Sequence, residues 1–163
     1  MPGAKSGVRK WLPLVEYIGL CEAVGLAGAY FTAHAIPTWY ASLTKPPFNP
    51  PNWLFGPVWT LLYICIGIAG WRIWREPSSP HRNRAFKLWW IQLALNAIWT
   101  PIFFGAHATF AALIVIVLLD ITVLALLKPA FKTCTVAGAL LLPYLAWILF
   151  ATLLNEELWR LNR

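Results

Sequence analysis

Charged residues are scarce in this sequence. They make up 12% of its 163 residues, about half of the roughly 25% that soluble domains carry. Apolar residues make up 60%, and the mean hydropathy is +0.63. This composition excludes an ordinary soluble domain and predicts a membrane protein.

Cysteine is also rare. Cys21, Cys65 and Cys134 are odd in number and far apart, which excludes a disulfide framework and a paired-cysteine metal site. The sequence also lacks a catalytic dyad, a nucleotide-binding loop and a cluster of metal ligands. We therefore expect no conventional hydrolase or redox chemistry, no metal site and no required cofactor.

What the chain has instead is long apolar runs. Each is close to the roughly 20 residues that cross a bilayer as a helix, and Lys128-Pro129 is expected to end the fourth. The first is too long for a signal peptide and contains Glu16 and Glu22. We predict one all-α domain over residues 1–163, a five-helix membrane bundle. The expected spans are Leu14–Ile36, Trp53–Trp74, Phe86–Phe104, Thr109–Leu127 and Val136–Leu154.

The net charge of +7 is distributed unevenly between the two predicted sides of the membrane. The excess lies on the N-terminal side, so the positive-inside rule places the N-terminus in the cytoplasm and the C-terminus outside. We attribute the charge to topology and lipid contact and expect no nucleic-acid partner. The N-terminal side carries Lys5, Arg9, Lys10, Arg72, Arg75, Arg82, Arg84, Lys87, Lys128 and Lys132, and the other side carries Lys45, Arg160 and Arg163.

Tryptophan occurs eleven times, and most copies lie near span ends, as in the aromatic belts of membrane proteins. Three lie deeper, on helical faces that also carry polar or small residues and should point into the bundle. These faces are compatible with simple helix packing or with an aromatic cavity for a flat apolar ligand. They are Trp59, Tyr63, Ile66 and Gly70; Gln92, Asn96, Trp99 and Phe103; and Pro143, Trp147, Ala151 and Leu154.

The connection between the first two spans combines prolines with aromatic residues and a single charge. Proline fixes φ, so we expect this connection to be stiff. The prolines, the single charged residue and two of the aromatic residues that give it this character are Trp39, Lys45, Pro46, Pro47, Pro50, Pro51 and Trp53.

Three segments resemble the TspO/MBR family of translocator and tryptophan-rich sensory proteins: WYASLTKPPFNPPNWLFGPVWTLLY, QLALNAIWTPIFFG and LLPYLAWILFATLLNEELW. The resemblance implies a five-helix bundle, commonly a homodimer, whose first connecting loop forms a lid over a ligand cavity. It also implies binding of porphyrins such as protoporphyrin IX, and of haem. A bacterial source would place the protein in the cell membrane, and a eukaryotic source in the outer mitochondrial membrane.

Site residues follow from the same resemblance. Trp59 and Trp147 match the tryptophans that the family ties to porphyrin degradation in light. The implied cavity-lining positions are Tyr40, Asn96, Trp99, Phe103, Ala151 and Leu154, to which the helical spacing adds Tyr63. The animal sterol motif is not matched, because Glu156 and Glu157 stand in the stretch where its tyrosine is needed. We therefore expect no specific sterol binding.

Several ionisable residues leave alternatives open. Glu22 and Asp120 lie within spans. Either one of them is a partner for a ligand pyrrole N–H or a proton-coupled transport site, or both are packing residues that are protonated or hydrogen-bonded to indole N–H groups. Among the histidines His34, His81 and His107, His34 is best placed to ligate haem iron. The alternative is that it caps a helix or lies at the membrane interface, as single histidines at span ends more often do. Three functions remain: a porphyrin-binding protein in tetrapyrrole handling or stress signalling, a light-dependent porphyrin-degrading enzyme, and a small-molecule transporter.

Overall fold

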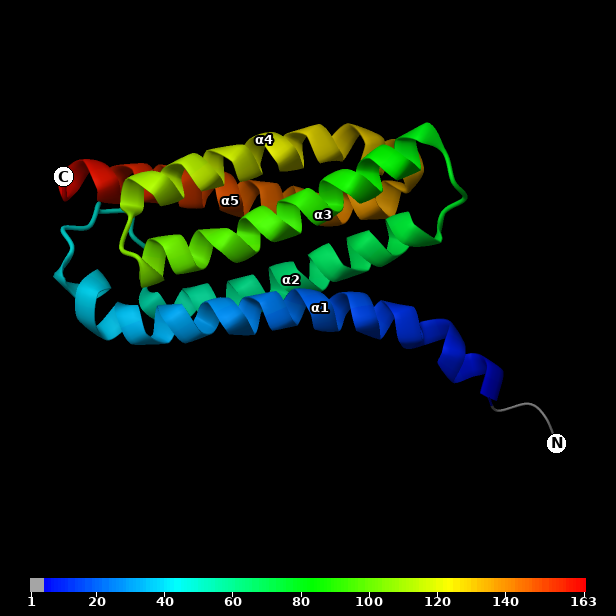
Figure 1. Cartoon of the computed structure of the whole chain (residues 1–163), viewed down its shortest axis with the longest axis horizontal. Coiled ribbons are helices and arrows are strands. Elements are labelled where there is room, and N and C mark those ends of the chain that lie inside the picture. The colour runs from blue at the N-terminus through cyan, green and yellow to red at the C-terminus, as the bar shows by residue number, and fades with distance from the viewer. Residues whose placement is uncertain (1–4) are drawn as a thin grey trace.

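The computed structural model describes residues 5–163, with side chains from Trp11 onward. The side chains of Lys5, Arg9 and Lys10, which entered the prediction of orientation, lie outside the described part. Five long helices run up and down, so the start of the first helix and the C-terminus lie at opposite ends of the bundle (Figure 1). The elements are α1 (Lys5–Ala35), η1 (Ile36–Tyr40), α2 (Asn52–Arg75), α3 (Pro80–Thr100), η2 (Pro101–Gly105), α4 (Thr109–Thr133) and α5 (Thr135–Leu161).

All five helices are long and apolar enough to cross a membrane. The predicted all-α, five-span fold is confirmed, and the protein is a multi-pass integral membrane protein. The helices are longer than the predicted spans. The expected end of the fourth span at Lys128-Pro129 is wrong, because Pro129 is buried inside α4, which continues to Thr133. Neighbouring helices in a bundle allow a proline within a span.

Two short π-helical segments extend α1 and α3. The segment η1 carries Trp39 and Tyr40, which therefore belong to a helical extension of α1 and not to the connecting loop. The segment η2 begins at Pro101, and its Phe103 is buried. Both segments start at or next to a proline, where the missing N–H interrupts the regular α-helical pattern. They turn aromatic side chains toward the same end of the bundle.

The helices pack unequally. The most extensive contacts are those of α3 with α4, α4 with α5, and α1 with α2. In Figure 1, α1 lies along α2 at the edge of the bundle. Of the described side chains of α1, only Cys21 and Ala35 are buried. The first helix therefore forms a flank and contributes little to the core.

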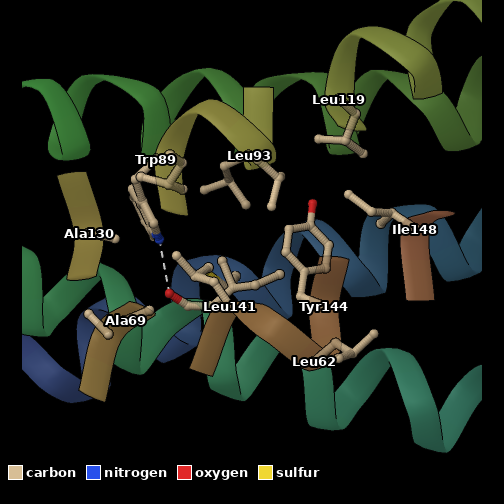
Figure 2. Close-up of a cluster of buried hydrophobic side chains, with 14 of the residues drawn as sticks. Leu62, Ala69, Trp89, Leu93, Leu119, Ala130, Leu141, Tyr144 and Ile148 are labelled. Carbon is tan, nitrogen blue, oxygen red and sulfur yellow. Dashed lines mark hydrogen bonds between the residues drawn. The ribbon is translucent and has the colours of Figure 1, made fainter. Parts of the chain in front are cut away.

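The core lies between α2, α3, α4 and α5. Figure 2 shows Trp89 among its side chains, and the Trp89 indole N–H donates to the carbonyl of Ile66 at 2.9 Å. Gly70 makes room for this ring, because a Cβ there would lie 2.4 Å from it. The large Trp89 ring and the small Gly70 thus fit together and fix α3 against α2. Trp89 lies near a predicted span end, but it is a core residue and not part of an aromatic belt.

A chain of buried hydrogen bonds also ties three helices together. The hydroxyl of Tyr63 on α2 donates to Asn96 Oδ1 on α3 at 2.9 Å. Asn96 Nδ2 donates to the hydroxyl of Tyr144 on α5 at 2.9 Å, and that hydroxyl donates to Gln92 Oε1, also at 2.9 Å. In hydrocarbon no water competes for these groups, so the network stabilises one alignment of α2, α3 and α5.

Candidate functional site

A cavity of about 340 Å³ lies between α1, α2, α3, η2 and α5. Its volume is at the lower end of the about 300–1,000 Å³ typical of small-molecule sites. The lining comes from the second half of α1 with η1, the first half of α2, the end of α3 with η2, and α5 from its middle onward. The cavity therefore occupies the half of the bundle near the loop between η1 and α2.

Aromatic rings form much of the cavity wall. Trp59 and Tyr63 lie one helical turn apart on α2, with ring centroids 5.5 Å apart. Trp99 and Phe103 are stacked at 5.0 Å with an interplanar angle of 19°. Trp147 on α5 completes the wall. Flat π-faces of this kind favour contact with another flat ring system.

Most sequence-predicted ligand-binding residues meet at this cavity. Asn96 is the exception: it lies behind Tyr63 and is held by the hydrogen bonds described above, so it supports the wall without lining it. Gln92, on the same face, is also a packing residue. The predicted residues that line the cavity are Tyr40, Trp59, Tyr63, Trp99, Phe103, Trp147, Ala151 and Leu154.

The sequence motifs do not indicate the wall that α1 provides. These side chains recur every three or four residues and so share one helical face. Most are small, and this leaves space beside the rings of the other helices. They are Glu22, Gly25, Leu26, Gly28, Ala29, Thr32 and Ala33 of α1, followed by Ile36 at the start of η1. Of these, only Glu22 is a candidate from the sequence. Phe55, Phe104 and Asn155 are further lining residues that the motifs did not indicate.

The cavity opens sideways between α1 and α2. Leu26 on its rim is 72% exposed, and Ala29, Ala33, Gly56 and Thr60 are exposed as well. All five belong to membrane-spanning helices. In a bilayer this rim faces lipid, so a ligand dissolved in the membrane can reach the cavity without crossing water.

Most polar groups of the wall already have protein partners. Tyr63 bonds to Asn96, Thr32 and Thr60 donate to carbonyls of their own helices, and Asn155 Oδ1 accepts from the Trp99 indole at 3.2 Å. Two groups differ. Glu22 Oε1 and Trp147 Nε1 are shielded and have no hydrogen-bond partner among the described residues. Among the shielded polar atoms of the described wall, one acceptor and one donor thus have no partner.

The family resemblance predicts that the connection between the first two spans forms a lid. None of its seven predicted lid residues, Trp39, Lys45, Pro46, Pro47, Pro50, Pro51 and Trp53, lines the cavity. Trp39 instead packs against Phe103, with ring centroids 5.5 Å apart, and stacks on His107 at 4.2 Å. Pro46 and Pro50 are buried, whereas Pro47, Pro51 and Trp53 are exposed. The residue that connects the loop with the cavity is Tyr40, which lines the cavity and donates its hydroxyl to Asn49 Oδ1 in the loop at 2.7 Å.

The loop is fixed to the C-terminal end of α5. Thr44 N donates to Asn162 Oδ1, and Asn162 Nδ2 donates to Thr44 O, both at 2.9 Å. Lys45 Nζ donates to the carbonyls of Ala41 and Leu43 and lies 5.0 Å from the centroid of the Tyr40 ring. The loop is therefore held to the end of α5 through Thr44 and to the cavity wall through the bond between Tyr40 and Asn49.

The remaining ionisable candidates lie elsewhere. Asp120 Oδ2 accepts from Thr152 Oγ1 at 2.7 Å, away from the cavity lining. His34 and His107 share a separate shallow pocket, and His81 is exposed near the start of α3. None of these histidines lines the aromatic cavity. Within residues 5–163 no group of three or more potential metal ligands is present.

Comparison with known proteins agrees with this architecture. Residues 17–160 match the model of the TspO/MBR family. "Tryptophan-rich protein TspO" of Archaeoglobus fulgidus is 45% identical over 151 residues, covering 93% of this chain and 97% of that protein. "Translocator protein" of Bos taurus and "Tryptophan-rich sensory protein" of Cereibacter sphaeroides are each 36% identical, covering 94% and 93% of this chain and 92% of each relative. The chain belongs to the TspO/MBR family.

Proposed function

We propose that the protein binds porphyrins, such as protoporphyrin IX and haem, in the aromatic cavity, and that it acts in tetrapyrrole handling or in stress signalling. The observation that carries this proposal is the wall formed by Trp59, Trp99 and Trp147 around a space of about 340 Å³. Indole faces stack on flat conjugated rings, and each such pair contributes about 0.5–1.5 kcal/mol beyond the buried area.

The charges near the cavity are consistent with an orientation for such a ligand. Protoporphyrin IX has an apolar macrocycle and two carboxylates on one edge. Lys45 lies beside Tyr40 at the loop end of the cavity. We propose that the carboxylates point to this end, where Lys45 and water stabilise their charge. The macrocycle then lies deeper, against the tryptophans.

The experiment is a titration of the purified protein in lipid nanodiscs with protoporphyrin IX in the dark. Tryptophan quenching and the Soret band report binding, and protein-free nanodiscs correct for partition into lipid. Trp59→Phe and Trp147→Phe should each raise the dissociation constant about 2- to 10-fold, because the phenyl ring offers a smaller stacking surface than the indole. Trp53→Phe is the matched control, because Trp53 is 71% exposed and lies outside the cavity. Equal dissociation constants for all four proteins would refute the proposed binding site.

A second candidate function is light-dependent degradation of the bound porphyrin. It is favoured by the place of the Trp59 and Trp147 indoles in the cavity wall, where either one can donate an electron to an excited macrocycle. Illuminating the same samples in air separates the two functions. A permanent spectral change that is lost in both Trp→Phe variants supports the enzyme, and a recoverable spectrum supports binding alone.

A further inference from the structure

The cavity contains an acidic side chain for which the fold provides no partner. Glu22 lines the wall, and its Oε1 is shielded without a hydrogen bond. Among the residues that the structure describes, no lysine, arginine or histidine lines the cavity, so none of these lining residues supplies a countercharge. A carboxyl group in a membrane span is costly unless it is paired. The missing partner therefore has to come from protonation, from water or from a ligand.

The position of Glu22 makes it a recognition group at the deep end of the cavity. Glu22 on α1 precedes Ile36, the first residue of η1 and part of the loop end of the lining, by fourteen residues. At 1.5 Å per residue the two positions are about 20 Å apart along α1. Glu22 is thus remote from Lys45 and the loop. Glu22 therefore gives this end of the cavity an acidic group, whereas the nearest described base at the other end, Lys45, lies outside the lining beside Tyr40.

The surroundings of Glu22 suit a cation. Gly25, one turn later, packs on the Tyr63 ring so closely that a Cβ there would lie 2.7 Å from it. Tyr63 and Trp59, with ring centroids 5.5 Å apart, belong to the same wall. Aromatic faces stabilise an organic cation by cation–π attraction, and a carboxylate adds a charged hydrogen bond. Neither contribution is available to a neutral hydrocarbon of the same shape.

We infer that the cavity also accepts lipophilic amines, which bind with the protonated nitrogen at Glu22 and the apolar body against the aromatic wall. The opening between α1 and α2 suits this class, because such amphiphiles concentrate in the bilayer. The inference rests on the cavity being a ligand site, as proposed above. It does not require porphyrin to be the ligand.

The test uses a matched pair of probes, 2-naphthylmethylamine and its neutral isostere 2-ethylnaphthalene. Binding to the full-length protein in nanodiscs is measured by calorimetry, with protein-free nanodiscs as the reference for partition. The wild type should prefer the amine by about tenfold or more, as expected for a charge-assisted hydrogen bond. Glu22→Gln should lose this preference and keep its affinity for the neutral probe, which also shows that the variant is folded.

The control variant is Glu16→Gln, which removes an exposed acid on the same helix outside the cavity. It should behave like the wild type. The inference is overturned if the wild type binds both probes equally, or if Glu22→Gln keeps the preference. Protoporphyrin IX is titrated in parallel. Porphyrin binding without amine preference contradicts this inference alone, whereas failure of all three ligands contradicts the cavity proposal as well.

Discussion

The contact between α1 and α2 leads to a prediction about Gly67. A Cβ at Gly67 would lie 2.7 Å from Ile18 Cα, 3.0 Å from Ile18 N and 3.0 Å from Tyr17 O. These are backbone atoms of the facing helix, which cannot move aside as a side chain can. Carbon atoms pack at about 3.5–4.0 Å, so Gly67→Ala should push α1 away from α2 by roughly 1 Å.

The free-energy cost of overpacking at Gly67 can be separated from the general effect of replacing a helical glycine by alanine. Overpacking of a tight contact costs about 1–3 kcal/mol, while alanine is favoured over glycine in a helix by about 1 kcal/mol. Gly19 on α1 provides the control, because no heavy atom lies within 4 Å of its added Cβ. Gly19→Ala should therefore show only the favourable effect. The difference between the two variants should equal the overpacking cost, about 1–3 kcal/mol.

The assay is reversible unfolding in mixed micelles with increasing SDS, followed by tryptophan fluorescence. Gly67→Ala should unfold at a lower SDS fraction than Gly19→Ala, and the wild type should lie between them or near Gly67→Ala. A Gly67→Ala variant as stable as Gly19→Ala would refute this account of the close α1–α2 contact.

Two further predictions concern polar contacts. Asn96→Leu removes the bonds to Tyr63 and Tyr144 and should destabilise the protein by about 1 kcal/mol, since hydrogen bonds between membrane helices average about 0.6 kcal/mol each; an unchanged SDS midpoint would contradict this. Asn162→Ala removes both bonds to Thr44, so amide hydrogen exchange in residues 43–51 should accelerate while exchange in the turn between α2 and α3 stays unchanged. Unaltered exchange in the loop would show that other contacts hold it.

The helix faces could be predicted from the sequence because large and polar residues repeat with the helical period. Trp59 and Tyr63, and Asn96 with Trp99 and Phe103, stand out against apolar neighbours. Spacing could not tell that Asn96 supports the wall while Trp99 lines it. That distinction depends on Tyr144 of α5, which reaches Asn96 across 48 residues of sequence.

The α1 wall could not be predicted in the same way. Gly25, Ala29 and Ala33 differ little from the apolar residues around them, so the face that lines the cavity carries no strong contrast in sequence. The sequence also does not predict that the helix continues through Pro37 to Tyr40, and the expected first span ends at Ile36. Prolines normally indicate helix ends. The buried Pro129 in α4 was misread for the same reason.

The most direct test of the central claim is to fill the cavity. Ala151 lines it on α5, whereas Ala146 on the same helix is exposed and does not line it. Protoporphyrin IX binding is measured for Ala151→Phe and Ala146→Phe in nanodiscs by tryptophan quenching. We predict that Ala151→Phe loses saturable binding and that Ala146→Phe binds like the wild type. Equal binding by both variants would contradict the claim that this cavity is the ligand site.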